Sequence, residues 1–306
     1  MEYKIIQKRW INYSISILLA LVGIISISVW GLKYGLDFTG GSLLQIKFVN
    51  QAPATSEQIT STLAPLDLGV ILAQPVAEDE MVLRFKEVDE KTHQQIIATL
   101  NAKSANSQTN AKIEESSFTT IGPTISAELK QKTWGAMIIV LLAIILYVAF
   151  AFRQVSRPVP SWKYGVAAVI ALAHDTLITV GLFSLLGHFA GIEVDSYFVT
   201  ALLTLLGFSV HDTIVVFDRI RENLKKQLPG TFLEVVNHSV NDTIVRSINT
   251  SLTAALVVLA LYFFGGASTK NFALAMSFGI LIGTYSSIFI ASPLVVDWHL
   301  WSMKKR

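Results

Sequence analysis

The sequence predicts a polytopic α-helical membrane protein with six transmembrane helices, arranged as one plus five around an extracytoplasmic α+β domain. Three observations predict this class. The chain has 306 residues, 52% of them hydrophobic and 15% charged, with a mean hydropathy of +0.53. Apolar runs recur at about the 20-residue length that a helix needs to cross a bilayer. A single polar stretch separates the first apolar run from the others.

Composition also excludes several classes of function. The net charge of +2 argues against a general nucleic-acid binder, which would present a basic face. The absence of cysteine removes disulfides, Cys-ligated metals and thiol catalysis. No phosphate-binding Gly-x-x-x-x-Gly-Lys-Ser/Thr motif occurs, so we do not expect an ATPase. No catalytic constellation or metal-ligand set is apparent, and we predict neither an enzyme nor a bound cofactor or metal.

Residues 1–32 are predicted to be a short cytoplasmic segment and the first span. Lys4, Lys8 and Arg9 precede an apolar run at Ile11–Trp30. A signal peptide begins similarly, but its apolar core is usually about 7–15 residues long and is followed by an Ala-x-Ala cleavage site. The run here is longer and lacks that site. We therefore expect an uncleaved helix.

Residues 33–132 are predicted to form the extracytoplasmic domain, because their apolar runs are short and alternate with polar residues. Strands are expected at Gly41–Val49, Val70–Val76, Glu80–Lys86 and Lys112–Thr120, with helices at Thr55–Leu66 and Asp89–Lys103. This βαββαβ order is typical of a ferredoxin-like fold. We expect a mobile loop at Ala102–Asn110 and a solvated side chain at His93.

Residues 133–303 are predicted to contain five more spans, followed by a cytoplasmic tail at residues 304–306. The apolar runs are Trp134–Phe152, Tyr164–Leu186, Tyr197–Phe217, Ile244–Phe264 and Phe272–Trp298. A polar lead-in at Thr124–Lys132 precedes the first of them.

The orientation follows from lysine and arginine in the short loops, which concentrate on the cytoplasmic side. With the N-terminus inside, the inner segments hold three, three, four and three such residues, whereas the outer short loops hold only Lys270. We therefore expect both termini in the cytoplasm and residues 33–132 outside it.

The stretch Gly207–Asn223, GFSVHDTIVVFDRIREN, places a carboxylate inside an apolar helix. Asp212 precedes Asp218 by six residues, which puts it about 9 Å below the charged end of the helix. A charge at that depth costs a few kcal/mol, so such a residue usually faces protein or water and has a function. We predict that Asp212 is a proton-coupling residue.

Arg246 begins a polar stripe in the next span, and we predict that it pairs with Asp212. The stripe recurs at i, i+3, i+4 and i+7 and consists of Arg246, Asn249, Thr250 and Thr253. Such a stripe faces protein or water rather than lipid. Two alternatives remain open, because Arg246 could extend its side chain to the interface and Asp212 could be a static counter-ion. Asp242, just before the apolar run, is expected to be a helix N-cap.

Two further patterns lie within the spans. His174-Asp175-Thr176 repeats the triplet His211-Asp212-Thr213, either as an internal repeat or by coincidence, and we regard Asp175, His174 and His211 as secondary proton-site candidates. In the last span, small residues recur every four positions at Ala275, Gly279, Gly283, Ser287 and Ala291. They predict a close helix-packing seam, either within the chain or against another subunit.

Three motifs in this order resemble one known family. They are LDFTGG at Leu36–Gly41, the Gly207–Asn223 stretch, and RSINTSLTAAL at Arg246–Leu256. Together they resemble SecF of the SecD/SecF family of bacterial protein-export membrane proteins, and the resemblance covers the whole chain. It implies a resistance-nodulation-division-like membrane fold in the bacterial cytoplasmic (inner) membrane.

The resemblance also implies partners and residue roles. The partners would be SecD, the SecYEG channel, the translocating preprotein and the lipid bilayer. By motif position, the family's carboxylate is Asp212 and its intramembrane arginine is Arg246. His211 departs from the family, which commonly has asparagine there, and either alters proton access or donates a hydrogen bond as asparagine would.

We therefore expect an accessory subunit of the Sec preprotein translocase that uses the proton motive force to drive late steps of export. Protonation of Asp212 would release Arg246 and move the outer domain. Two rival functions remain, a transporter half that extrudes a small molecule or lipid, and a passive assembly or chaperone subunit with a static Asp212–Arg246 pair.

Overall fold

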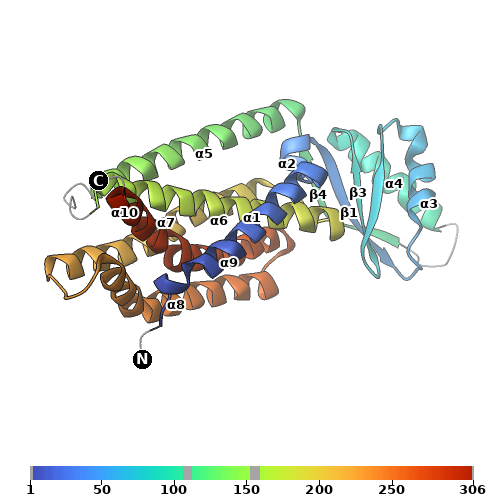
Figure 1. The fold of residues 1–306 in the computed structure, drawn as a ribbon. Helices are drawn as coiled ribbons and strands as arrows, with labels where there is room; N and C mark the ends of the chain where they lie inside the picture. The colour runs from blue at the N-terminus through green and yellow to red at the C-terminus, as the bar shows by residue number, and fades with distance from the viewer. Residues whose placement is uncertain (1–2, 106–111, 152–158, 305–306) are drawn as a thin grey trace. The chain divides into compact units, whose positions relative to one another are not determined.

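The computed structural model describes residues 3–105, 112–151 and 159–304. The chain divides into two compact units. One is Tyr34–Lys132, and the other combines Met1–Lys33 with Thr133–Arg306. The first contains a small β-sheet and the second contains long apolar helices (Figure 1). This combination confirms the predicted fold class.

The unit Tyr34–Lys132 is built on an antiparallel sheet with the strand order β2-β3-β1-β4. The strands are β1 (Gly41–Val49), β2 (Leu72–Ala77), β3 (Glu80–Phe85) and β4 (Lys112–Ile121). The helices are the short α2 (Leu36–Thr39), α3 (Ser56–Leu63) with its 3₁₀ extension η2 (Ala64–Leu66), and α4 (Glu90–Ala105). Apart from α2 and η2, the order is the predicted βαββαβ of a ferredoxin-like fold.

Alternating burial holds this unit together. β1 and β3 each bury every second side chain, because successive strand residues point to opposite faces of a sheet. Leu44, Ile46 and Leu83 are fully buried. They share one core with Ile96 and Leu100 of α4, and α3 and α4 lie on the same face of the sheet (Figure 1). The side chains of β1 and β3 on the other face are half-buried.

The expectation that His93 is solvated is wrong. His93 is only 4% exposed, and its ring stacks on that of Phe118 with the ring centroids 3.8 Å apart. Nδ1 lies 3.2 Å from Glu90 and Nε2 lies 3.0 Å from Glu115. The physical reason is position, because His93 is one turn before the buried Ile96 and shares its core-facing side of α4.

Helix α4 also extends further than predicted. The stretch Ala102–Asn110 was expected to be a mobile loop, but the helix continues through Ala105. Residues 106–110 of that stretch lie outside the described residues. Helix ends are the least certain part of a sequence-based prediction, since local composition sets them only weakly.

The second unit contains six helices in the described residues that are long and apolar enough to cross a membrane. They are α1 (Arg9–Trp30) after the 3₁₀ turn η1 (Ile6–Lys8), α5 (Pro123–Ala151), α6 (Ser161–Phe189), α7 (Ser196–Lys225), α8 (Phe232–Phe264), and a last span made of α9 (Ala267–Ser286), η3 (Ser287–Ala291) and α10 (Ser292–Lys304). The predicted division into one plus five spans is confirmed. The polar lead-in at Thr124–Lys132 is part of α5.

Asp242 is not an N-cap. Helix α8 begins ten residues earlier, at Phe232, where Thr231 forms a capping box with Glu234. Asp242 therefore lies inside the helix and accepts a hydrogen bond of 2.8 Å from Nε of Arg219 on α7. The charged C-terminal end of α7 is thus tied to α8 at an exposed position.

The first span is fixed to the five-helix part through glycine. Gly23 of α1 and Gly181 of α6 meet so closely that a Cβ added at Gly181 would lie 2.4 Å from the Cα of Gly23. Ser26 of α1 donates to the backbone oxygen of Gly181 at 3.2 Å. Small residues permit such backbone contact between membrane helices.

The last span contains a π-helical turn, η3, between α9 and α10. Ser292 donates to the backbone oxygen of Ser287 at 2.9 Å across this turn. Beyond it, Asp297 of α10 accepts hydrogen bonds of 2.7 Å from Arg9 and 2.9 Å from Tyr13 of α1. Wide turns of this kind are frequent at functional sites, and this one adjoins the polar cluster described next.

Candidate functional site in the membrane helices

Asp212 lies on the buried face of α7 and is only 7% exposed. It shares that face with Leu205, Ser209 and Val216, which follow the spacing of one helix side. Its Oδ1 accepts a 2.7 Å hydrogen bond from Oγ of Ser247 on α8. Its Oδ2 is buried and has no hydrogen-bond partner among the described residues. The carboxylate is therefore only partly satisfied by this chain.

The structure does not form the predicted pair between Asp212 and Arg246. Ser247 occupies the position that faces Asp212 and is buried, whereas Arg246 is exposed. Adjacent helix residues point about 100° apart, so α8 cannot present both side chains to α7 at once. In the described part of the chain, Arg246 makes no ion pair.

The whole predicted polar stripe shares the orientation of Arg246. Asn249, Thr250 and Thr253 are exposed as well, and Thr253 donates to the backbone oxygen of Asn249. The buried face of α8 carries a second series at four-residue spacing, consisting of Thr243, Ser247, Ser251 and Ala255. The predicted stripe thus faces away from the rest of this chain.

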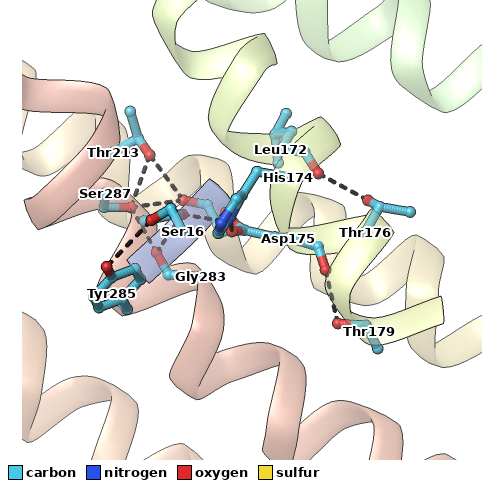
Figure 2. Close-up of polar contacts among 12 residues, drawn as sticks. Ser16, Leu172, His174, Asp175, Thr176, Thr179, Thr213, Gly283, Tyr285 and Ser287 are labelled. Carbon is cyan, nitrogen blue, oxygen red and sulfur yellow. Dashed lines mark hydrogen bonds and ion pairs between the residues drawn. The ribbon is translucent and has the colours of Figure 1, made fainter. Parts of the chain in front are cut away.

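Asp175 is more completely buried than Asp212 and is only 1% exposed. Its Oδ2 accepts from Ser209 of α7 at 2.6 Å and from Ser286 of α9 at 2.7 Å. Its Oδ1 lies 3.0 Å from Nδ1 of His174. Asp175 therefore joins three helices, and Figure 2 shows it beside His174 among the neighbouring polar groups.

His174 completes this group in an unusual way. The side chain is 10% exposed, and its second ring nitrogen, Nε2, is buried without a hydrogen-bond partner in the described residues. His211, its counterpart in the repeated triplet, is exposed on α7. The two triplets therefore occupy different surroundings, although each aspartate accepts a hydrogen bond from a serine of the following helix.

Further hydroxyl pairs surround the two carboxylates. Thr213 of α7 and Ser287 of η3 are 2.8 Å apart, and Figure 2 shows their contact. Ser251 of α8 bonds Thr284 of α9, while Ser16 of α1 lies 3.2 Å from the hydroxyl of Tyr285. The sequence prediction missed these serines and threonines, because such residues in apolar helices often bond only their own backbone.

The small-residue seam packs within the chain. A Cβ added at Gly279 would lie 2.5 Å from Leu205 of α7, and one at Gly283 would lie 3.0 Å from Cβ of Ser209. Ala275, Ser287 and Ala291 are buried as well. Two alternatives were open for this seam, and the structure shows contact with α7. The close approach also brings Ser286 within reach of Asp175.

A candidate metal centre does not emerge from the described residues, in which no group of three His, Cys, Asp or Glu side chains could hold an ion. The site is instead a set of two carboxylates, one imidazole and several hydroxyls. Such groups can bind, release and pass protons.

Comparisons with known proteins cover nearly the entire chain. Residues 101–301 match the family described as protein export membrane protein SecD/SecF, C-terminal, and residues 25–52 match the SecD/SecF GG motif. The chain is 41% identical to a protein translocase subunit SecF of Thermobaculum terrenum, over 96% of this chain and 93% of that protein. It is 37% identical to the subunit of the same name from Vibrio alginolyticus, over 94% of this chain and 88% of that protein.

Two solved structures are also similar. One is the crystal structure of a Thermus SecDF, described as a translocon-associated membrane protein, with a TM-score of 0.78 and 33% identity. The other shows SecDF in a super-membrane-facing form, with a TM-score of 0.68 and 33% identity. Each match covers 100% of this chain but only 39% and 40% of the respective solved chain.

Proposed function

Because the chain belongs to the SecD/SecF family as a SecF subunit of the protein translocase, we propose that it works with SecD and the SecYEG channel in late steps of export. The proton motive force supplies the energy, and the translocating preprotein is the cargo. The similar SecDF chains are more than twice as long as the part that this chain matches. The part of those SecDF chains that lies beyond the match supports SecD as the partner of the SecF-like part.

One observation carries the proton role, namely the partly satisfied carboxylate of Asp212. It is buried inside a helix of membrane-spanning length, and one of its oxygens has no partner among the described residues. Such intramembrane carboxylates mark proton paths. One charge crossing the membrane is worth about 2.3 kcal/mol per 100 mV, which is comparable to typical conformational couplings of about 1–3 kcal/mol.

The exposed stripe supports SecD as the partner of this face. Arg246 is exposed within a membrane-spanning helix, and a cation there is costly unless it meets protein or water. A second set of membrane helices, carrying an anionic or polar group, would satisfy it. Ser247, the next residue, holds Asp212. A shift of α8 that remakes the bond to Asp212 would therefore also move Arg246 against SecD.

A proton can act at this point by changing the hydrogen bond between α7 and α8. Ionised Asp212 only accepts, whereas the protonated acid can also donate. The hydrogen bond from Ser247 is stronger to a charged acceptor than to a neutral one. Uptake of a proton thus loosens one helix contact and allows another. The chain links the unit Tyr34–Lys132 to α1 at one end and to α5 at the other, so helix motion can be passed to it.

The test is export into inverted membrane vesicles that contain SecD and SecYEG, with and without an imposed proton gradient. Asp212→Asn should lose the gradient-driven component of export, because asparagine keeps the shape but cannot titrate. The matched control is Asp218→Asn, the same change on the same helix at a side chain that is 67% exposed. Normal gradient-driven export by Asp212→Asn would refute the proposal, and export of the wild type that ignores uncouplers would favour a passive subunit.

The membrane orientation is part of the same proposal. The excess of lysine and arginine in alternate loops supports an orientation with both termini in the cytoplasm of a bacterium and residues 33–132 outside its inner membrane. Protease added to spheroplasts should cleave within residues 33–132, whereas protease added to inverted vesicles should not. Cleavage only from the cytoplasmic face would reverse the orientation.

A further inference from the structure

We propose that His174 and Asp175 form a second proton-binding site, in which a proton enters at Nε2 of the imidazole and ends on the carboxylate. The proposal rests on the proposed function, since the same gradient supplies the proton. This second proposal goes further, because it assigns a site on α6 that is separate from Asp212 on α7. Three independent features of the described residues support it.

The first feature is the degree of enclosure. Asp175 is 1% exposed. Within the described residues, its carboxylate is bonded by two hydroxyls at Oδ2 and by one imidazole at Oδ1. A carboxylate can be ionised, with all three neighbours donating, or protonated, with one neighbour accepting. Ser209 and Ser286 both bond Oδ2, whereas Oδ1 faces the imidazole, whose Nδ1 can accept a proton from it.

The second feature is the unpartnered nitrogen of His174. Nδ1 contacts Asp175 and Nε2 is buried with no partner in the described residues. A neutral imidazole carries its proton on one nitrogen only, and the hydrogen bond at the other nitrogen decides which. The state of Asp175 therefore sets the state of Nε2. Exchange of a proton at Nε2 therefore requires a motion that lets water or a polar group reach a nitrogen that is buried in this conformation.

The transfer balances without any other reactant. A proton binds Nε2 of the neutral imidazole and forms an N–H bond there. The Nδ1–H bond breaks, and that proton forms an O–H bond at Oδ1 of the ionised carboxylate. The imidazole remains neutral with its proton moved from one nitrogen to the other, and Asp175 becomes a carboxylic acid. The reverse sequence releases the proton.

The third feature is the set of helices that the carboxylate joins. Ser209 belongs to α7, and Ser286 is the last residue of α9, immediately before the π-helical turn η3. Hydrogen bonds to an ionised acceptor are roughly twice as strong as neutral ones. Protonation of Asp175 therefore weakens the attachment of α6 to both helices at the point where the last span departs from regular geometry.

Charged groups on the elements packed against α6 are engaged elsewhere. Arg9 of α1 and Asp297 of α10 form an ion pair, and Lys163 of α6 donates to Ser302 of α10. On α7, Asp212 accepts from Ser247 of α8. The faces turned toward Asp175 from α7 and α9 present hydroxyls. His174 is thus the titratable neighbour in contact with it.

The two aspartates are built alike, which links the new site to the first. Asp175 is held by a serine 34 residues further along the chain, on the next helix. Asp212 is held by a serine 35 residues further, again on the next helix. Each carboxylate thus accepts a hydrogen bond from a serine of the next helix, so the same proton chemistry is available at both.

The direct test follows the imidazole nitrogens of His174 by NMR in the full chain, labelled with ¹⁵N-histidine and reconstituted with SecD in nanodiscs. The chain has six histidines, and the His174→Gln variant identifies the signals of His174. We expect the proton to move from Nδ1 to Nε2 as the pH falls, and Asp175→Asn to abolish this switch. One fixed tautomer at every pH, conversion to imidazolium, or the same switch in Asp175→Asn would overturn the proposal.

The functional arm uses the export assay in inverted vesicles. Asp175→Asn and His174→Gln should each lose gradient-driven export. The matched control Thr179→Val should keep it, because that hydroxyl donates only to the backbone oxygen of Asp175. Wild-type export by Asp175→Asn would overturn the proposal. If wild-type export ignores the gradient, the proposed function fails, and the NMR result alone decides whether the site exists.

Discussion

Asp175 and Asp212 are both buried in membrane helices, but their hydrogen bonds are completed in different ways. Asp175 is bonded by His174, Ser209 and Ser286, so its partners come entirely from this chain. Among the residues that the structure describes, Asp212 accepts a hydrogen bond from Ser247 alone, and its other oxygen has no partner. The comparison teaches that one carboxylate belongs to the internal packing of the subunit. The other keeps one oxygen without a partner in the described part of the chain.

The largest expected effect is on stability. If Asp212→Ala destabilised the chain more than Asp175→Ala, the contrast between the two carboxylates would be wrong. Asp175→Ala should lower the free energy of unfolding by about 2–4 kcal/mol, since it leaves buried donors without their acceptor. Asp212→Ala should cost about 1 kcal/mol, because it removes one hydrogen bond. Thermal unfolding of the purified chain in detergent measures both. An equal or larger loss in Asp212→Ala would show that the two sites do not differ as described.

The next effect concerns the partner of the open site. Arg246→Ala should weaken co-purification with SecD by about tenfold, which corresponds to about 1.4 kcal/mol, and should leave the unfolding temperature of the isolated chain unchanged. Lys270→Ala, a change of charge in the first turn of α9, is the control and should not affect binding. Undiminished binding by Arg246→Ala would place the SecD contact on another face.

The smallest expected effect concerns a second histidine–carboxylate group, which lies outside the membrane spans and can be compared with His174 and Asp175. His93 lies between Glu90 and Glu115, and His93→Ala should destabilise α4 locally by about 1 kcal/mol. Hydrogen exchange of peptides from α4, followed by mass spectrometry, measures this. Unchanged exchange in His93→Ala would mean that the stacked ring does not stabilise the unit.

The same measurement has a predicted pH dependence. The amide of Gln94, and then His93, hold the pKa of Glu90 below its ordinary value of 4.5. A lowered pKa in the folded state contributes stability above the unfolded pKa, and that contribution is lost as the pH falls through the lowered value. The protection of α4 amides in the wild type, measured relative to the unfolded chain at the same pH, should therefore fall below about pH 4.5, and Gln94→Ala should reduce this fall.

Periodicity in the sequence was enough to predict most of the fold. The alternation in Gly41–Val49 predicted β1 with its observed ends, because a half-buried strand repeats every two residues. Apolar runs of membrane length predicted the six spans, since few other structures need them. His93 was misjudged because its position on the core side of α4 was given less weight than its polarity.

The candidate site was less accessible from sequence, for a geometric reason. Asp212 stood out because a carboxylate in an apolar run is rare. Its predicted partner was wrong by one residue, Arg246 in place of Ser247, and one residue turns a helix by about 100°. Ser209 and Ser286 could not be picked out from the sequence. A serine in a membrane helix can bond either its own backbone or a distant carboxylate, and the sequence pattern is the same in both cases.

The π-helical turn at Ser287–Ala291 also sets the phase of everything that follows it. A regular helix advances by 3.6 residues per turn, so a stretch with one additional residue per turn leaves α10 rotated by about 100° relative to an uninterrupted span. In the observed phase, Asp297 meets Arg9 and Tyr13 at the opposite end of the chain. Removing a single residue from the turn would point that carboxylate elsewhere, so the length of this turn selects how the last helix closes against the first.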